Sequence, residues 1–196
     1  MKSQSYIAKI VNLGLTLFVV TALTGLILGG VQHITAGAIE NVQRQEKAEA
    51  LKAVLPDADS FSERPLAAGA DPMVLEVQEA SGEGKNVGWC LIVSTKGYGG
   101  LIKTLVGLTS EGTVSAIRIL EHGETPGLGA KAVLPSFSGQ FDGKEQLPLR
   151  IVKQTPAAPD EIQAISGATI TSEALVLGVH GAVEYWKTFL RGGVTP

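Results

Sequence analysis

The chain has 196 residues, of which 44% are apolar, and its 16 Lys and Arg against 19 Asp and Glu give a net charge of −3. This balance offers no electrostatic basis for nucleic-acid binding, and no basic cluster interleaved with aromatic residues is present. A single cysteine, Cys90, excludes an internal disulfide, a CxxCH haem attachment and an all-cysteine zinc or iron–sulfur site, so any redox chemistry needs a bound organic cofactor or a partner.

Residues 10–31 form an uncharged segment rich in Leu, Val, Ile and small residues. As a helix these 22 residues extend about 33 Å, enough to cross a bilayer core. A cleaved signal peptide is the alternative, since residues 36–38 read Ala-Gly-Ala, but its apolar run is usually only about 7–15 residues. Lys2 and Lys9 precede the segment and Glu40 is the first charge after it. The positive-inside rule therefore predicts a single pass through the inner (cytoplasmic) membrane, with the C-terminal domain on the periplasmic or extracytoplasmic side.

Residues 38–54 change to a charged helical pattern that Pro56 ends. The candidate inward positions of this segment are Ile39, Val42, Ala50, Leu51 and Val54. We expect the segment to lift the globular domain from the membrane and to pack on its side. The predicted organisation is a cytoplasmic N-terminus and transmembrane anchor at 1–35, an amphipathic connecting helix and loop at 36–60, and a folded domain at 61–196.

Short strands separated by turns follow. Strands are predicted at residues 73–78, 87–95, 101–108 and 113–120, with turns at 81–86, 96–100 and 111–112. They favour an antiparallel meander with one face covered by helices. Residues 61–72 carry no periodic signal, and Cys90, inside an apolar run, is expected in the core.

The C-terminal third predicts a short helix over 130–137, a strand over 149–152 and a long helix over 171–190. The long helix is amphipathic, with one apolar stripe formed by Leu175, Val179, Val183, Trp186 and Leu190. Together the elements predict an α+β fold in which helices flank an antiparallel sheet.

The sequence Ser-Gly-Ala-Thr-Ile-Thr-Ser at residues 166–172 leads directly into the long helix. Its small residues let the backbone approach a bulky group, and three hydroxyls lie at the entrance of a helix whose first amides lack internal partners. Such an N-terminus favours an anion, above all a phosphate. Capping of the helix by Thr or Ser is the alternative interpretation.

Two glycine-rich loops accompany this motif. Residues 97–100 read Gly-Tyr-Gly-Gly, and residues 124–129 read Glu-Thr-Pro-Gly-Leu-Gly before a helix that begins Ala-Lys. Neither matches a P-loop or a GxGxxG motif, and each is compatible with a simple turn. As binding segments they would bring backbone amides and Tyr98 against a flat ring, with Leu128 as an apolar contact. Lys131 would supply a cation beside such a ring.

In this order, the membrane anchor and the three motifs resemble the FMN-binding domain family that includes the G subunit of the Rnf electron-transport complex and the related C subunit of the sodium-translocating NADH:quinone oxidoreductase. The resemblance covers most of the chain and implies FMN bound covalently through Thr169 as a phosphoester. The other flavin-binding residues that it implies are Ser166, Gly167, Ala168, Thr171, Ser172, Tyr98, Gly99, Gly100, Glu124, Thr125, Gly127, Leu128, Gly129 and Lys131. The chain departs from the family's transferase recognition pattern at Gln163, where an Asp usually precedes the attached Thr by six residues.

The resemblance also implies a role. It is that of a membrane-anchored component of an ion-translocating ferredoxin:NAD oxidoreductase complex, passing single electrons and having no substrate site or catalytic residue of its own. The implied partners are a flavin-bearing integral subunit, iron–sulfur subunits and a flavin transferase for maturation. The three histidines are dispersed and no carboxylate pair has metal-site spacing, so no metal is predicted. The alternative function is that of a membrane-anchored structural or assembly protein without a redox cofactor.

Overall fold

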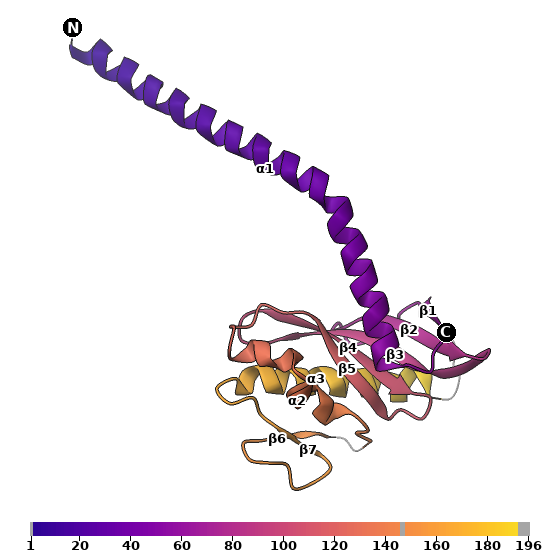
Figure 1. Ribbon diagram of the computed structural model, residues 1–196. Coiled ribbons are helices and arrows are strands. Elements are labelled where there is room, and N and C mark those ends of the chain that lie inside the picture. The colour runs from indigo at the N-terminus through magenta and orange to yellow at the C-terminus, as the bar shows by residue number, and fades with distance from the viewer. Residues whose placement is uncertain (1, 146–147, 192–196) are drawn as a thin grey trace. The chain divides into compact units, whose positions relative to one another are not determined.

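The structure is a computed structural model that describes residues 2–145 and 148–191, with side chains described at residue 9 and from residue 11 onward within these ranges. The chain divides into two compact units, Met1–Gln45 and Glu46–Pro196. The first unit is helical, and the second contains the strands and the other helices (Figure 1).

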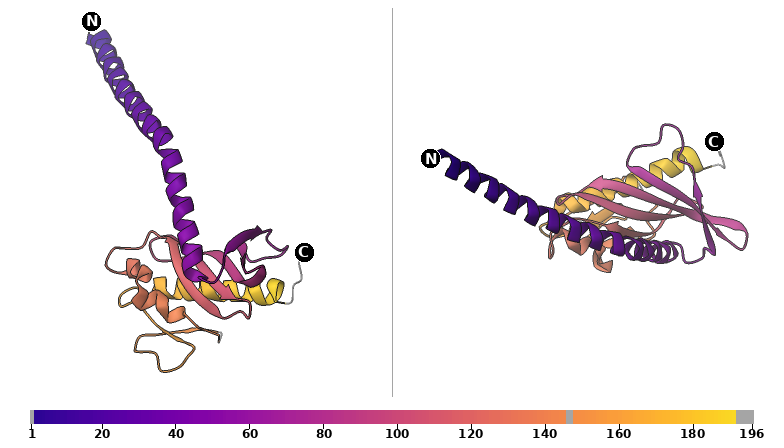
Figure 2. Two further views of the ribbon diagram at one scale, coloured as in Figure 1. Left: turned by 45° about the vertical axis from the view of Figure 1, so that its right-hand side comes forward. Right: turned by 90° about the horizontal axis from the view of Figure 1, so that it is seen from above.

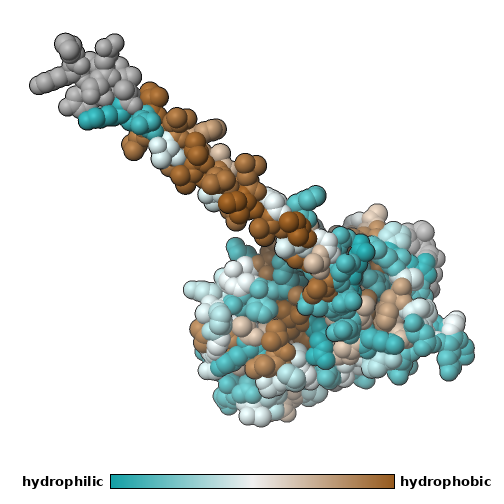
Figure 3. All heavy atoms as spheres, turned by 45° about the horizontal axis from the view of Figure 1, so that its top comes forward, coloured by the Kyte–Doolittle hydropathy of each residue, from teal (hydrophilic) through white to brown (hydrophobic). Residues whose placement is uncertain are grey.

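Helix α1 (Lys2–Val54) runs without a break through residues 10–31 and 38–54, the apolar and the charged segment that the sequence pattern distinguishes. Among the described residues it is the one helix long and apolar enough to cross a membrane, and its apolar surface is visible in Figure 3. Within the first unit, four threonine hydroxyls donate to the carbonyl oxygen four residues earlier at 2.8–2.9 Å; these are Thr16, Thr21, Thr24 and Thr35. Such bonds satisfy the hydroxyls inside the helix, as a lipid environment without water requires.

The end of α1 belongs to the folded unit. Leu51 and Val54 are buried, and the helix ends two residues before Pro56, as predicted. Ile39 and Val42 are 53% and 51% exposed, so the prediction that they face inward is wrong. An apolar side chain is buried only where another surface meets it, and these two residues precede the folded unit, which begins at Glu46.

Five strands form the predicted antiparallel meander, in the spatial order β1-β2-β3-β4-β5. Their bounds are β1 (Ser60–Arg64), β2 (Val74–Gly82), β3 (Lys85–Lys96), β4 (Leu101–Thr109) and β5 (Val114–Glu121). The α+β fold is therefore confirmed. Strand β1 was not predicted, because it is an edge strand with one half-buried and four exposed residues and so lacks an apolar alternation.

The turn between β2 and β3 is tighter than the predicted turn over 81–86. Glu83 and Gly84 have φ of 51° and 75°, while Gly82 pairs with Lys85. Positive φ at both central residues is characteristic of a two-residue type I′ turn, which matches the twist of the flanking strands. Both strands consequently extend into the segment assigned to the turn.

Helices cover both faces of the sheet, whereas the sequence predicted one covered face. Alternate residues of β3 divide between two core clusters: Leu91 and Val93 join one, and Cys90 and Ile92 the other. Burial raises the pKa of the Cys90 thiol to about 12, in keeping with its predicted core position.

Glycines allow close helix–sheet contact on each face. On one face α3 (Thr169–Tyr185) crosses β3 and β4, with Gly178 against Val93 (Figure 2). On the other face Val54, at the end of α1, lies against Gly107, where an added Cβ would be only 2.8 Å from the valine Cβ. Helix α3 is thus held, at its middle, on a sheet that is packed from both sides.

The elements between β5 and α3 are short. Two short helical turns, η1 (Gly129–Val133) and α2 (Pro135–Ser138), replace the predicted helix over 130–137, and a third turn, η2 (Gly139–Phe141), follows them. The predicted strand over 149–152 is β6 (Arg150–Val152), which pairs in parallel with β7 (Glu161–Gln163) as a separate sheet. Helix α3 continues into the π-helical turn η3 (Trp186–Leu190). The predicted stripe is confirmed, since all its members are buried except Leu190, which is half-buried against the core.

Candidate functional site

The three motifs of the sequence meet around a pocket of about 480 Å³. It is formed by the loop between β3 and β4, the loop after β5 and the N-terminal end of α3. The lining residues are Tyr98, Glu124, Thr125, Leu128, Gly129, Gly167, Ala168, Thr169, Ile170 and Thr171. Segments up to 73 positions apart in the sequence therefore build one site.

Helix α3 begins beside this pocket without a side-chain cap. Its N-cap is Ala168, and the first backbone bond into the helix runs from the Ser172 N–H to the Ala168 carbonyl at 3.1 Å. Within the described part of the chain, the amides of residues 169–171 have no hydrogen-bond acceptor. Capping by Thr or Ser, the alternative from sequence, is therefore wrong. The unpaired amides and the positive end of the helix dipole favour an anion instead.

The three hydroxyls at this helix entrance have different surroundings. The Ser172 hydroxyl is buried, donates to the Ala168 carbonyl at 3.0 Å and accepts the Ile165 N–H at 3.0 Å. The Thr171 hydroxyl is buried and donates to the Glu124 carboxylate at 2.6 Å. Thr169 is half-buried and lines the pocket, and no hydrogen bond to its hydroxyl is found among the described residues. Of the three, the Thr169 hydroxyl is the one available to a ligand.

Glu124 is a buried carboxylate at the centre of the site. It is 6% exposed; its Oε1 accepts the Gly99 N–H at 2.9 Å, and its Oε2 accepts the Thr171 hydroxyl. Its own N–H donates to Nδ1 of His122 at 3.2 Å. An added Cβ at Gly97 or Gly129 would overlap the carboxylate. These two glycines therefore make room for Glu124, a role that the sequence pattern did not reveal.

The apolar part of the lining is exposed. Tyr98 is 74% exposed, Ile170 52% and Leu128 44%, so a flat ligand can bury side chains that otherwise face water. Ile170 was not predicted as a site residue, because only the hydroxyls and the small residues of the motif at 166–172 pointed to ligand binding. Its position at the first turn of a helix that faces the pocket is the signal that could have identified it.

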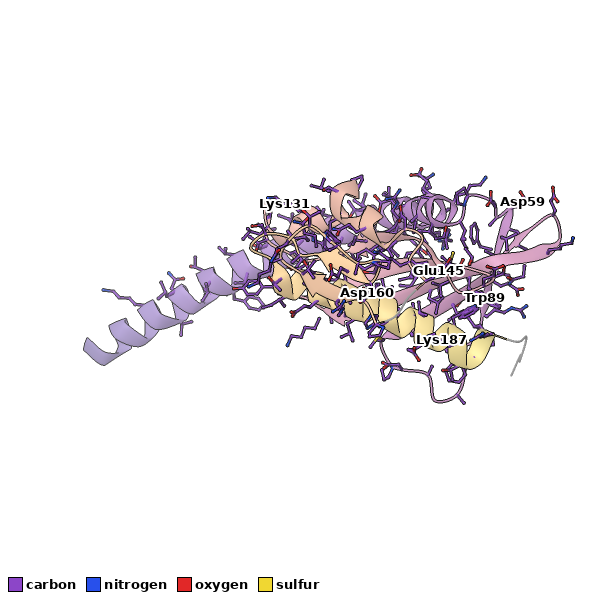
Figure 4. All side chains as sticks on the ribbon, turned by 90° about the horizontal axis from the view of Figure 1, so that it is seen from below. Asp59, Trp89, Lys131, Glu145, Asp160 and Lys187 are labelled. Carbon is purple, nitrogen blue, oxygen red and sulfur yellow. The ribbon has the colours of Figure 1, made fainter. Side chains whose placement is uncertain are left out.

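Six residues implied by the resemblance belong to the same segments but are not among the described residues that line the pocket: Ser166, Ser172, Gly99, Gly100, Gly127 and Lys131. Gly99 and Ser172 act behind the lining, through the hydrogen bonds given above. Gly127 and Gly167 have φ of 79° and 78°, which glycine adopts readily. Lys131, labelled in Figure 4, lies exposed on η1.

These features fit a flavin nucleotide. The pocket volume lies within the usual range for cofactor sites, about 300–1,000 Å³. The uncapped amides of α3 suit a phosphate, and the exposed Tyr98, Leu128 and Ile170 suit an aromatic ring. The fold and pocket thus define an FMN-binding domain, and the sequence profile of that family, described as the FMN-binding domain, matches residues 97–184.

The chain resembles whole proteins over almost its full length. It is 36% identical over 192 residues to the G subunit of the proton-translocating ferredoxin:NAD(+) oxidoreductase complex of Clostridium ljungdahlii, covering 97% of each chain. It is 35% identical over 193 residues to the G subunit of the Na(+)-translocating ferredoxin:NAD(+) oxidoreductase complex of Acetobacterium woodii, covering 92% of this chain and 93% of that one. The crystal structure of the C subunit of Na(+)-translocating NADH-quinone reductase from Parabacteroides distasonis is 25% identical, with a TM-score of 0.49 over 62% of this chain and 63% of that chain. The chain belongs to the G-subunit family of ion-translocating oxidoreductase (Rnf) complexes and is a membrane component of such an assembly.

Proposed function

We propose that this chain is the component of an ion-translocating ferredoxin:NAD oxidoreductase complex that carries FMN as a phosphoester on Thr169. The position of Thr169 supports this assignment. Its hydroxyl lies at the pocket without a partner among the described residues, while the hydroxyls of Thr171 and Ser172 are buried and hydrogen-bonded. The relatives from Clostridium ljungdahlii and Acetobacterium woodii, whose names give ferredoxin and NAD, support the type of complex.

Each part of the pocket has a role in holding FMN. The uncapped amides of residues 169–171 would hold the phosphate, whose charge the dipole of α3 would stabilise. The exposed side chains of Tyr98, Leu128 and Ile170 at the pocket would hold the ring. When bound, FMN accepts and releases electrons one at a time, so the protein needs no substrate site of its own.

Attachment replaces the O–H bond of Thr169 by an ester bond. Its Oγ1 loses a proton and forms a bond to the phosphorus of FMN, while the phosphoanhydride bond of an activated flavin dinucleotide breaks and its nucleoside monophosphate leaves with that proton. We infer a flavin transferase that supplies this donor. Gln163, at the position of the family's usual Asp, has an exposed side chain that such an enzyme can contact. Its backbone N–H and carbonyl are held by the Gln140 side chain at 2.7 and 3.3 Å.

We also propose the topology of the protein. Lys2 and Lys9 precede the apolar segment and place the N-terminus in the cytoplasm, with residues 1–35 as the anchor. The folded unit, which includes the end of the connecting helix from Glu46 onward, then lies on the periplasmic or extracytoplasmic side. A flavin-bearing integral subunit and iron–sulfur subunits are the expected electron partners, since the relatives are parts of complexes.

Covalent attachment is tested on a denaturing gel. The full chain is expressed with a flavin transferase, and flavin fluorescence is recorded on its band. Wild type and Thr169→Ser should fluoresce, since both keep a hydroxyl, whereas Thr169→Ala should be dark because it lacks the oxygen that forms the ester. Thr171→Ala is the matched control and should stay fluorescent, because the Thr171 hydroxyl is buried and already bonded to Glu124, so it is not the oxygen that forms the ester.

Two results would contradict the proposal in different ways. A dark wild-type band from a yellow native protein would mean that FMN is bound without a covalent bond. A colourless native protein, with the transferase active on a known substrate, would favour the structural or assembly role without a redox cofactor.

Topology is tested separately by protease protection. In intact cells the folded domain should resist protease, and it should be digested once the outer compartment is opened. Digestion that begins only after the inner membrane is broken would mean that the orientation is the reverse of the one proposed. A mature chain that starts after Ala38 would mean that the apolar segment is a cleaved signal peptide and not an anchor.

A further inference from the structure

We propose that Glu124 is the positioning residue of the flavin pocket. Its carboxylate joins the three segments that form the pocket, and its negative charge lowers the reduction potential of the bound flavin. The first part concerns the chain itself, whereas the second rests on the proposed function.

The hydrogen bonds of Glu124 join segments that are far apart in the sequence. Glu124 lies in the loop after β5. It accepts the N–H of Gly99, 25 positions earlier in the β3–β4 loop, at 2.9 Å. It also accepts the hydroxyl of Thr171, 47 positions later in the first turn of α3, at 2.6 Å. One carboxylate thus fixes the glycine loop and the helix N-terminus relative to each other.

The residues around the carboxylate leave space for it and donate hydrogen bonds to it. Gly97 and Gly129 leave the space that it occupies, and a Cβ on Gly129 would also lie 2.8 Å from the Thr171 hydroxyl oxygen. Burying a carboxylate is costly unless hydrogen bonds replace its hydration, and the two donors supply such bonds. No lysine, arginine or histidine forms an ion pair with Glu124 in the described ranges of the chain. Its charge is therefore not neutralised by a neighbouring cation.

This charge has a consequence for a bound flavin. Glu124 lines the same pocket as Thr169, so it shares a partly buried environment with the cofactor that Thr169 would hold. Charges interact more strongly there than in water. Reduction adds electrons to the flavin, and a nearby anion opposes that addition. Removing the charge while keeping the side-chain shape should raise the reduction potential.

The assembly of the pocket is tested without flavin. Hydrogen exchange of residues 97–101 and of the start of α3 is measured in the full chain in detergent, expressed without a transferase. Glu124→Ala should exchange about tenfold faster at residues 97–101, because the Gly99 N–H loses its acceptor. Glu124→Gln should retain most of the protection, since its amide oxygen can still accept that N–H. Unchanged exchange in Glu124→Ala would overturn the positioning role. Should that variant fail to fold, Thr171→Val, which keeps the side-chain shape but cannot donate to Glu124, should exchange faster at residues 97–101, and unchanged exchange there would overturn the same role.

The effect of the charge is tested by the midpoint potential of the flavin-loaded chain, measured by visible spectroelectrochemistry. Glu124→Gln should have a higher potential than wild type. Glu111→Gln is the matched control, because Glu111 is exposed in the β4–β5 turn and loses the same charge; its potential should equal that of wild type. Equal potentials in wild type and Glu124→Gln would overturn the electrostatic role. A chain that binds no flavin would refute the proposed function and this electrostatic role, while the exchange experiment would still decide the positioning role.

Discussion

Replacing Trp186 by alanine tests the packing that fixes the far end of α3 and thereby the orientation of its N-terminus at the pocket. Trp186 is 5% exposed, and its ring lies against Gly112 in the β4–β5 turn, where an added Cβ would overlap it. The guanidinium of Arg191 lies over the ring, 5.9 Å from its centre. Removing a buried aromatic side chain of this size costs roughly 3–5 kcal/mol. For a domain of about 150 residues, that loss corresponds to a melting temperature about 6–20 °C lower.

A second substitution separates packing from hydrogen bonding. The Trp186 indole Nε1 is buried and has no hydrogen-bond partner in the described part of the chain. Trp186→Phe keeps much of the ring and removes this unpaired donor, whose burial costs about 1–3 kcal/mol. We therefore expect Trp186→Phe to cost less than about 1.5 kcal/mol, well below the cost of Trp186→Ala.

The measurement is thermal unfolding of the full chain in detergent, followed by far-ultraviolet circular dichroism so that loss of the indole does not remove the signal. The melting temperature should be highest for wild type, lower for Trp186→Phe and lowest for Trp186→Ala, with or without flavin. A Trp186→Ala chain that melts with the wild type would refute the packing and would mean that this face is reserved for a partner protein of the complex.

Three further predictions concern the site and its support. Gly129→Ala should destabilise the chain by about 1–3 kcal/mol and reduce the flavin fluorescence of the gel band, because the new Cβ would overlap the Glu124 carboxylate; Gly139→Ala, where the nearest atom to an added Cβ is 3.8 Å away, is the control and should match wild type. The pKa of His180 is lowered by burial, and its Nε2 accepts the Leu149 N–H at 2.7 Å. In the unfolded chain this imidazole therefore binds a proton more readily than in the folded protein. Its contribution to the free energy of unfolding is complete above about pH 6.5 and is lost as the pH falls toward the lower folded pKa. In His180→Gln, denaturant titrations across this pH range should lose this pH dependence of stability, and an unaltered dependence would contradict the assignment. Gln163→Asp should increase the fraction of chain that carries covalent flavin after limited exposure to the transferase, whereas an equal or smaller fraction would show that the transferase does not read this position.

The sequence by itself determined the features that local patterns encode. An uncharged run of 22 residues is long enough to be a membrane helix, short apolar runs bounded by turns indicated β3 and β4, and a stripe at helical spacing identified the buried face of α3. The Ser-Gly-Ala-Thr motif and the two glycine loops were enough to place the chain in its family. Patterns of this kind depend on neighbours within one turn or one strand, so they can be read without knowing the fold. Edge strand β1 escaped detection because its exposed residues carry no such pattern.

Only the tertiary structure decided how these pieces form a site. The family resemblance singled out Thr169, but no local pattern distinguishes its hydroxyl from that of Thr171. Their difference depends on the hydrogen bond from Thr171 to Glu124, 47 positions away in the sequence. It also could not show that Gly97 and Gly129 accommodate a carboxylate, since a glycine is equally suited to a turn or a ligand contact. These properties depend on the distances between segments that the packing of α3 on the sheet sets, and no local pattern records them.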